Sequence, residues 1–189
     1  QNLTVDQTMF TVEQLVIDVL IDSPCANVSN ITFSTGTNFG DVDGIGFFEE
    51  PTGTFPFNEG LMIACGNAGL GGGPNDANIN NTISTGGFNW PGDADLTAVA
   101  GAQTNNATII EFDFVPIASE ISFRFLMASE EYGNPTFECQ FSDVFGFFLT
   151  DQGGATTNLA VLPDGVTPIL VTTVHPDNTA NGAPCPGIN

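Results

Sequence analysis

Pairs of aspartates separated by one residue are the feature of this sequence best suited to bind a metal ion. Asp41 and Asp43 stand in Asp-Val-Asp-Gly, and Asp93 and Asp95 stand in Asp-Ala-Asp-Leu. In a loop, both carboxylates of such a pair can face one hard cation, and backbone carbonyls can complete its shell. We therefore predict calcium sites at these two pairs. The alternative is structural, because Asp also caps helices and closes turns.

A further acidic group is predicted around Glu130 and Asp143. Neighbouring residues of an extended chain point to opposite sides, so only one of the two consecutive glutamates can face Asp143. We expect Glu130 and Asp143 to hold another cation, or one of them to pair with Arg124. For Arg124 itself, the prediction is a structural ion pair with a strand carboxylate such as Glu111 or Asp113.

The charge balance of the whole chain supports a role for cations. One basic residue stands against 22 Asp and Glu, which gives a net charge of −21 over 189 residues. Such a field repels nucleic acid and anionic membranes and attracts metal ions and cationic groups. We therefore predict calcium as the cofactor and exclude nucleic acid as a partner.

Cysteine use and the start of the chain indicate an extracellular protein. The four cysteines have no C-x-x-C spacing, which favours two disulfides over a zinc site. Three pairings are open, and we favour Cys25 with Cys65 and Cys139 with Cys185. The chain begins at Gln1 without an export segment, so we expect a signal peptide that has been removed. No apolar run is long enough to span a bilayer.

Ligand binding and catalysis have few candidate residues. Trp90 and Tyr132, the single Trp and the single Tyr, are the predicted stacking platforms for a glycan. Glu130 and Asp143 could form the carboxylate pair of a glycoside hydrolase. His175, the single histidine, is not accompanied by the Gly-x-Ser-x-Gly elbow of a serine hydrolase. We therefore expect a protein that is not an enzyme.

The elements that position these residues are mainly strands. Thr11 and Gln14 have capping-box spacing, and apolar residues follow at helical intervals, so 11–21 is predicted to be an amphipathic helix. A short helix through 96–100 is expected to be capped by Asp93 or Asp95. Alternating or continuous apolar patterns predict strands at 28–33, 45–48, 61–65, 107–115, 120–127, 143–149, 158–162 and 169–174. The fold class is therefore all-β, with a β-sandwich or jelly roll as the architecture and one domain over 1–189.

Several of these segments resemble a known family. The sequence reads Pro-Gly-Asp-Ala-Asp-Leu at 91–96, Phe-Asp-Phe-Val-Pro at 112–116, Ile-Ser-Phe-Arg-Phe at 121–125, Ala-Ser-Glu-Glu-Tyr at 128–132 and Phe-Ser-Asp-Val-Phe-Gly-Phe-Phe-Leu at 141–149. Together with the opening helix, this series is similar to the choice-of-anchor L family over nearly the whole chain. The resemblance implies a secreted, β-rich surface module of Bacteroidota-type bacteria, held by one of several C-terminal anchors or sorted by the type IX route.

The resemblance differs at the C-terminal end. Family members continue into further strands after a stretch like Ala-Pro-Cys-Pro-Gly at 183–187, whereas this chain ends at Asn189. We expect either that C-terminal strands of the family domain are missing, or that another chain supplies a strand to an open sheet edge.

These expectations lead to one predicted function and three alternatives. The predicted function is a non-enzymatic cell-surface module for adhesion or extracellular assembly, stabilised by calcium. Its partner would be a component of the cell surface or the extracellular matrix. The alternatives are a carbohydrate-binding module, a homo-oligomeric filament subunit completed by strand exchange, and a glycoside hydrolase.

Overall fold

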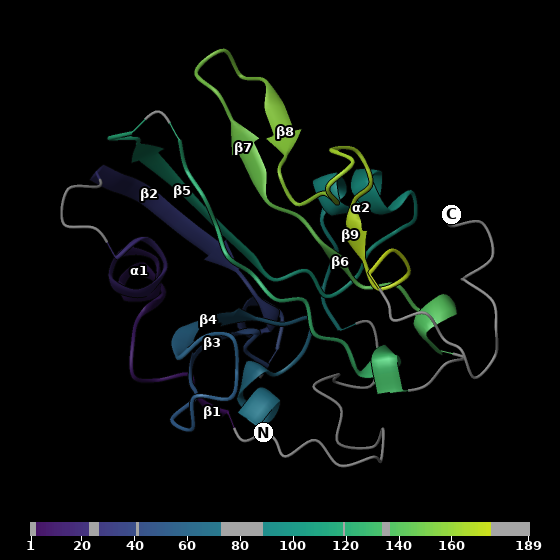
Figure 1. Ribbon diagram of the computed structural model, residues 1–189, viewed down its shortest axis with the longest axis horizontal. Coiled ribbons are helices and arrows are strands. Elements are labelled where there is room, and N and C mark those ends of the chain that lie inside the picture. Colours follow the sequence, from purple (N-terminus) through teal and green to yellow (C-terminus); the bar gives the residue numbers. More distant parts are fainter. Residues whose placement is uncertain are drawn as a thin grey trace. The chain divides into compact units, whose positions relative to one another are not determined.

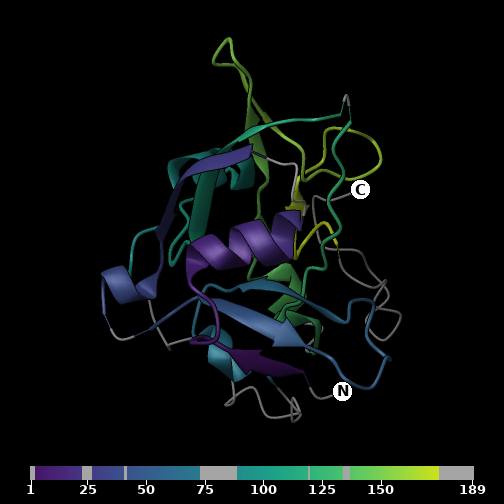
Figure 2. The same ribbon diagram turned by 90° about the vertical axis from the view of Figure 1, so that its left-hand side faces the viewer.

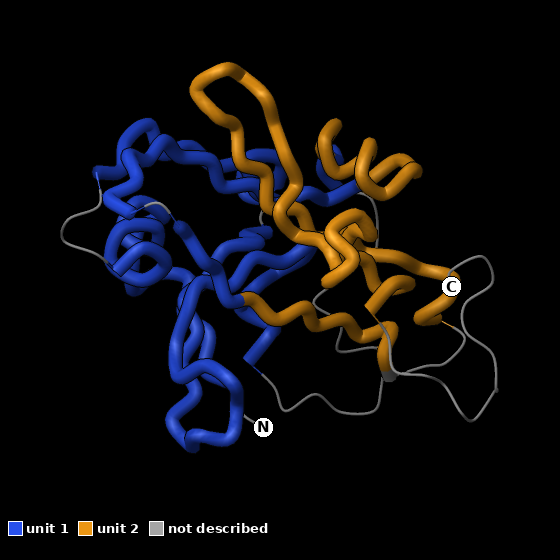
Figure 3. The backbone as a smooth tube through the Cα atoms, turned by 45° about the horizontal axis from the view of Figure 1, so that its top comes forward, with its two compact units in different colours: residues 1–92, 105–124 blue, residues 93–104, 125–189 orange. Residues whose placement is uncertain are grey.

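A computed structural model describes residues 3–22, 27–40, 42–72, 89–118, 120–133 and 137–174. The chain forms two compact units, coloured separately in Figure 3. Unit 1 comprises Gln1–Gly92 with Asn105–Arg124, and unit 2 comprises Asp93–Thr104 with Phe125–Asn189. The described strands all pair in antiparallel sheets, and the predicted all-β class is confirmed (Figure 1). The two-layer sandwich within that class stays a prediction.

The described residues of unit 1 form one small sheet and one ribbon. The sheet has the order β1-β3-β4, formed by β1 (Thr4–Asp6), β3 (Ile45–Glu49) and β4 (Glu59–Ile63). The ribbon pairs β2 (Asn27–Ser34) with β5 (Ile109–Val115). Its register shifts between Ser29 and Thr32, where Asn30 adopts a positive φ of 53°. Asn tolerates this left-handed conformation better than most residues, so the bulge suits it.

The opening helix of unit 1 begins as the sequence predicts. Thr11 is its N-cap, and the capping box is present because the Thr11 and Gln14 side chains each accept a backbone N–H of the other residue. Only α1 (Val12–Gln14) is α-helical, however, and η1 (Leu15–Ile21) continues as a π-helix. The apolar residues at helical spacing indicate a helix but cannot distinguish between these two windings.

The core of unit 1 forms around this helix. Leu15 packs with Ile45 and Phe47 of β3, and Ile110 of β5 packs against the same cluster. The Phe10 ring meets Phe47 edge-on at 4.9 Å between centroids. Figures 1 and 2 show the helix between the β2–β5 ribbon and the β1-β3-β4 sheet. The helix therefore packs between these two sheets.

Unit 2 contains one α-helix and two short ribbons among its described residues. The helix α2 (Ala94–Ala100) ends at Gly101, whose φ of 66° is the left-handed conformation typical of a C-cap. The ribbons pair β6 (Val144–Phe145) with β9 (Ile169–Leu170) and β7 (Phe148–Thr150) with β8 (Thr156–Asn158). Short 3-10 turns lie at η2 (Gly36–Asn38) and η3 (Ala68–Gly72) in unit 1, and at η5 (Glu130–Gly133) and η6 (Phe137–Cys139) in unit 2.

Four predicted strands differ from the structure. The strand β8 overlaps the predicted strand 158–162 only at Asn158, and β9 covers only the first two residues of 169–174. The described residues of 120–127 pair in no sheet, although their alternation predicts a strand. The predicted strand 143–149 is divided into β6 and β7, which pair with different partners. The division falls at Gly146, where an added Cβ would lie 2.5 Å from the Phe148 ring and 2.8 Å from Leu96. Only glycine fits this close approach.

Candidate functional site

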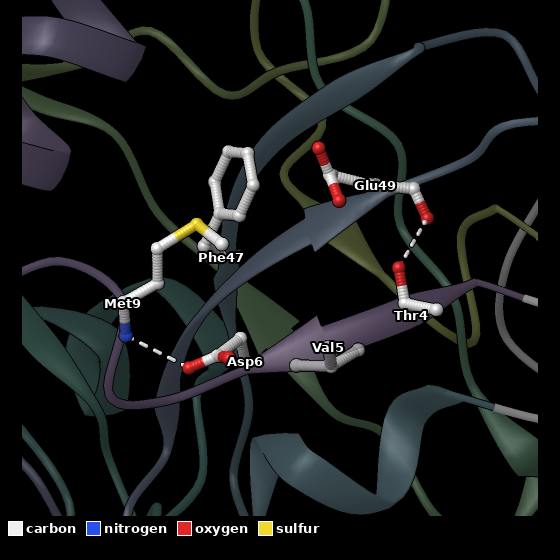
Figure 4. A pocket seen from close by; sticks show the side chains of 6 residues that line it. All are labelled: Thr4, Val5, Asp6, Met9, Phe47 and Glu49. Atoms are coloured by element: carbon white, nitrogen blue, oxygen red, sulfur yellow. Dashed lines mark hydrogen bonds between the residues drawn. The ribbon is translucent and has the colours of Figure 1, made fainter.

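A pocket of about 260 Å³ lies on the β1-β3-β4 sheet of unit 1 (Figure 4). Its lining comprises Thr4, Val5, Asp6, Met9, Phe47 and Glu49. Met9 follows β1 and extends its side chain toward Phe47 in Figure 4, while Asp6 and Glu49 contribute carboxylates. The site therefore combines apolar walls with negative charge.

Strand register explains why these side chains meet. Thr4 pairs with Glu49, and Asp6 pairs with Phe47, so all four side chains stand on the same face of the sheet. Glu49 in turn pairs with Glu59 of β4, which extends this row of the face across the third strand. The helix buries the part of this face around Phe47 and leaves the end with Glu49 and Glu59 exposed.

The carboxylates of the pocket differ in how they are satisfied. Asp6 accepts the backbone N–H of Thr8 at 2.6 Å, the Thr8 hydroxyl at 2.9 Å and the Met9 N–H at 2.8 Å. These bonds, the Thr8 N–H first, hold the pKa of Asp6 below its usual value. The carboxylates of Glu49 and Glu59, by contrast, form no hydrogen bond or ion pair with another described residue. Two like charges directly opposite on neighbouring strands repel each other.

A second acidic cluster surrounds Tyr132 in unit 2. Its hydroxyl oxygen is buried and has no hydrogen-bond partner among the described residues. Burial raises the pKa of Tyr132, and the negative charges of Asp143, Glu131 and Glu138 add to the shift. The Ser129 hydroxyl donates to Glu131 and lies 3.5 Å from an Asp143 oxygen.

The backbone at Glu130 differs from the extended chain on which the predicted partner of Asp143 was based. Glu130 and Glu131 belong to the 3-10 turn η5 and not to an extended strand, so the rule of opposite sides does not apply to them. The hydrogen bonds of Ser129 connect Asp143 with Glu131, and the cation site predicted at Glu130 and Asp143 stays a prediction. Tyr132 is half-buried and points its buried hydroxyl into this cluster, and its role as a stacking platform stays a prediction.

Two of the four paired aspartates, Asp43 and Asp93, make local backbone contacts, and the predicted calcium sites stay predictions. Asp93 is the N-cap of α2 and accepts the Leu96 N–H at 2.9 Å, while Asp95 lies exposed in the first helical turn. Asp43 accepts the Ile45 N–H at 2.9 Å through its side chain. Asp41 lies outside the described residues. The described contacts thus assign Asp43 and Asp93 local backbone roles.

Trp90 is a core residue of unit 1. Its relative exposure is 4%, and its indole N–H donates to the Ala107 carbonyl at 3.1 Å. An added Cβ at Gly36 would lie 3.1 Å from the indole ring, so the neighbouring backbone is also close. A sugar cannot stack on a ring buried in this way. The predicted glycan platform at Trp90 is therefore corrected to a structural role.

Arg124 makes contacts other than those predicted. Its guanidinium lies 4.8 Å above the centre of the Phe57 ring and donates to the Pro56 carbonyl at 3.3 Å. Glu111 and Asp113 instead accept hydrogen bonds from Thr32 and Asn30 across the β2–β5 ribbon. An amide and a hydroxyl group thus donate hydrogen bonds to these strand carboxylates. The predicted ion pair of Arg124 with Glu111 or Asp113 is wrong.

Sequence reasoning missed Asp6, Glu49 and Glu59 as members of one site. Each belongs to a different strand, and only the register of three paired strands brings them to one face. The one signal in the sequence was the spacing of Asp6 and Thr8, which is typical of an Asx turn. It indicates a turn and not a shared site.

No group of three or more His, Cys, Asp or Glu residues in the described ranges is arranged to hold a metal ion. The helices in the same ranges include none of the length and apolarity that a bilayer crossing requires. The disulfide pairings stay predictions, because Cys25 and Cys185 lie outside the described residues, as does His175.

Comparison with known proteins supplies the remaining context. The profile of the Choice-of-anchor L domain matches residues 4–189, essentially the whole chain. No curated protein and no solved structure gives a match. With a match of this length, the chain belongs to the family of choice-of-anchor L domains.

Proposed function

We propose that this choice-of-anchor L domain is a binding module for adhesion or extracellular assembly and that it performs no catalysis. Its family consists of secreted, surface-associated modules, and the chain shares that location. The proposal adds the mode of action, which is contact through open sheet edges. Its partner would be a component of the cell surface or the matrix, or another copy of the chain.

The β2–β5 ribbon is the observation that carries this proposal. Among the described residues it has only two strands, so each strand pairs along one edge alone. At its end, Val115 is 60% exposed and Ile117 is 69% exposed. An unpaired edge next to exposed apolar residues is a template for strand addition, and a two-stranded ribbon gains stability from a third strand.

Salt dependence tests this mode of assembly. Two copies with a net charge of −21 repel each other, so self-association should appear only when the charge is screened. Light scattering after size exclusion should find monomers at about 0.01 M NaCl, where the Debye length is about 30 Å. It should find oligomers at about 1 M NaCl, where that length is about 3 Å.

A matched pair of variants separates the ribbon from the rest of the surface. Val115→Asp places a charge at the ribbon end and should abolish the oligomers. Val166→Asp makes the same change at a 77% exposed residue of unit 2, outside every strand, and should leave them intact. Monomers at every salt concentration, or equal effects of the two variants, would contradict assembly through the ribbon.

We also propose that calcium stabilises the chain. The charge of −21 supports this, as does the cluster of Glu131, Glu138 and Asp143 around the Tyr132 hydroxyl. The described residues contain no group of three ligands arranged to hold a metal ion. The net negative charge therefore carries the proposal. Hard cations prefer carboxylate oxygens, and a bound ion would relieve the repulsion among them.

The alternative functions receive less support. A glycan-binding surface would lack its predicted Trp90 platform, because that ring is buried. A glycosidase needs one carboxylic acid with a raised pKa as its proton donor. In the pocket of unit 1 the resolved pKa shift is in the opposite direction, since hydrogen bonds lower the pKa of Asp6.

A further inference from the structure

We propose that the pocket on the β1-β3-β4 sheet receives a lysine side chain from a partner protein. This inference rests on the proposed binding role and specifies the chemistry of one contact within it. Three features of the pocket carry the inference. They are its apolar walls, its unneutralised carboxylates and the absence of lysine from this chain.

The apolar part of the pocket fits the stem of a lysine side chain. Phe47 is only 5% exposed and forms a rigid wall, because Phe10, Leu15 and Ile45 pack against it. Met9 is 56% exposed and forms an adaptable wall, since its unbranched thioether can follow the shape of a ligand. Lysine buries its four-carbon stem along such surfaces while its charged end stays in a polar environment.

The charged part of the pocket fits the ammonium group. Glu49 is exposed at the pocket and stands opposite Glu59, so two carboxylates repel each other at its edge. Asp6 adds a third negative charge, and its lowered pKa keeps it ionised at neutral pH. An ammonium group placed near Glu49 and Glu59 would convert this repulsion into attraction.

The carboxylates of Asp6, Glu49 and Glu59 come from three different strands and stand around an apolar space. They therefore do not form a compact shell of metal ligands. The described residues contain no three-ligand metal group, which favours an organic cation at this site. A lysine ammonium suits this arrangement better than an arginine, because its three donors rotate freely and need no planar, bidentate partner.

Residues 1–189 cannot supply the occupant. The sequence contains no lysine, since its single basic residue is Arg124. The Arg124 guanidinium already lies over Phe57 and bonds to the Pro56 carbonyl. Residues 1–189 of a second copy therefore cannot supply the group either, and their charge of −21 would oppose their approach to this face.

Titration with small probes tests the pocket directly. Nα-acetyl-lysine amide, followed by amide NMR at low salt, should shift the signals of Thr4, Asp6, Met9 and Glu49 together. Nα-acetyl-norleucine amide has a similar stem without the charge and should bind at least about threefold more weakly, as expected for loss of an exposed ion pair. Equal shifts with both probes, or shifts spread evenly over the acidic surface, would overturn the proposal.

A matched pair of variants separates the pocket from the general negative field. Glu49→Gln should weaken lysine-probe binding at least about threefold. Glu111→Gln also removes one charge, from an exposed strand position of the same unit outside the pocket, and should change binding little. Both side chains are exposed, so both variants should fold, and melting temperatures no lower than that of the wild type would verify this. Equal weakening by the two variants would overturn the proposal.

The two proposals fail in different ways. Lack of lysine-probe binding combined with salt-dependent assembly through Val115 would overturn the pocket and leave the binding module intact. Lysine-probe binding at Glu49 without any assembly would support the pocket and contradict assembly through the ribbon.

Discussion

Glu50 shows how a single carboxylate can be buried without a cation beside it. Its relative exposure is 3%, and its two oxygens accept hydrogen bonds from the Thr52 hydroxyl and from the backbone N–H groups of Thr52, Thr54 and Phe55. The loop after β3 thus closes around the charge. In a chain with almost no basic residues, backbone N–H groups and hydroxyls supply the positive dipoles.

The Glu50 bonds predict a pH-dependent effect on stability. They lower the pKa of Glu50, the Thr52 hydroxyl contributing most, so the stabilisation is present above the unfolded pKa of about 4.3 and is lost as pH falls through the folded pKa. Glu50→Gln should therefore lower the melting temperature at pH 7, and its difference from wild type should shrink below about pH 4. Calorimetry across this range would measure it, with Glu111→Gln as an exposed control. A difference that grows on acidification would contradict this role of Glu50.

At single residues, the sequence predicted roles that depend on near neighbours and missed those that depend on distant ones. Asp93 could be proposed as a helix cap because Leu96, the donor of its hydrogen bond, is three residues away. The burial of Trp90 depends on Gly36 and Ala107, and the stacking of Arg124 depends on Phe57. Residue types alone contain no information about such contacts.

At the scale of elements, the capping box at Thr11 is the clearest local signal that the structure confirms. Replacing Thr11 with Ala removes the oxygen that accepts the Gln14 N–H at 3.3 Å. We expect Thr11→Ala to reduce the free energy of unfolding by about 1 kcal/mol, whereas Thr11→Ser should retain most of the stability. Chemical denaturation would compare the three proteins. A loss with Ser as large as the loss with Ala would show that the cap does not account for the effect.

Strands could be predicted where two paired segments both show alternating apolar and polar residues. They were harder to predict where only one segment shows this pattern. The alternation in β2 and β5 predicted both strands of the ribbon to within a few residues. The same signal at 120–127 predicts a strand that the structure does not pair. Alternating apolar and polar residues indicate that an extended segment has one buried and one exposed face. A strand also needs hydrogen bonds from a distant segment. The division at Gly146 likewise depends on contacts with Leu96 and Phe148.

For the whole molecule, charge is the property most accessible from composition alone. A net charge of −21 disfavours compactness through self-repulsion, and a divalent ion that binds only the folded state would oppose it. The candidate site was less predictable than the charge. The pocket with Glu49 and the cluster at Tyr132 each require several elements to meet in a particular register.

Chelation tests the proposed calcium effect. Calcium at about a hundredfold excess over its Kd should stabilise the fold by about 2.7 kcal/mol, and EDTA should reverse the gain. Calorimetry would measure both, and Asp143→Asn should reduce the gain whereas the ribbon variant Asp113→Asn should not. Calcium affinity should also fall toward pH 4 as carboxylates become protonated. A melting temperature that changes with neither calcium nor EDTA would contradict the proposal.

The position of Arg124 has a consequence for proteolysis. It is the only residue after which trypsin could cut, it is exposed, and it is the last residue of unit 1 before Phe125 opens the longer part of unit 2. A single nick there would yield fragments 1–124 and 125–189. Because Asp93–Thr104 belongs to unit 2 but lies in the first fragment, the two fragments would still share a folded unit after the cut. The nicked protein could therefore be expected to stay together until it is denatured.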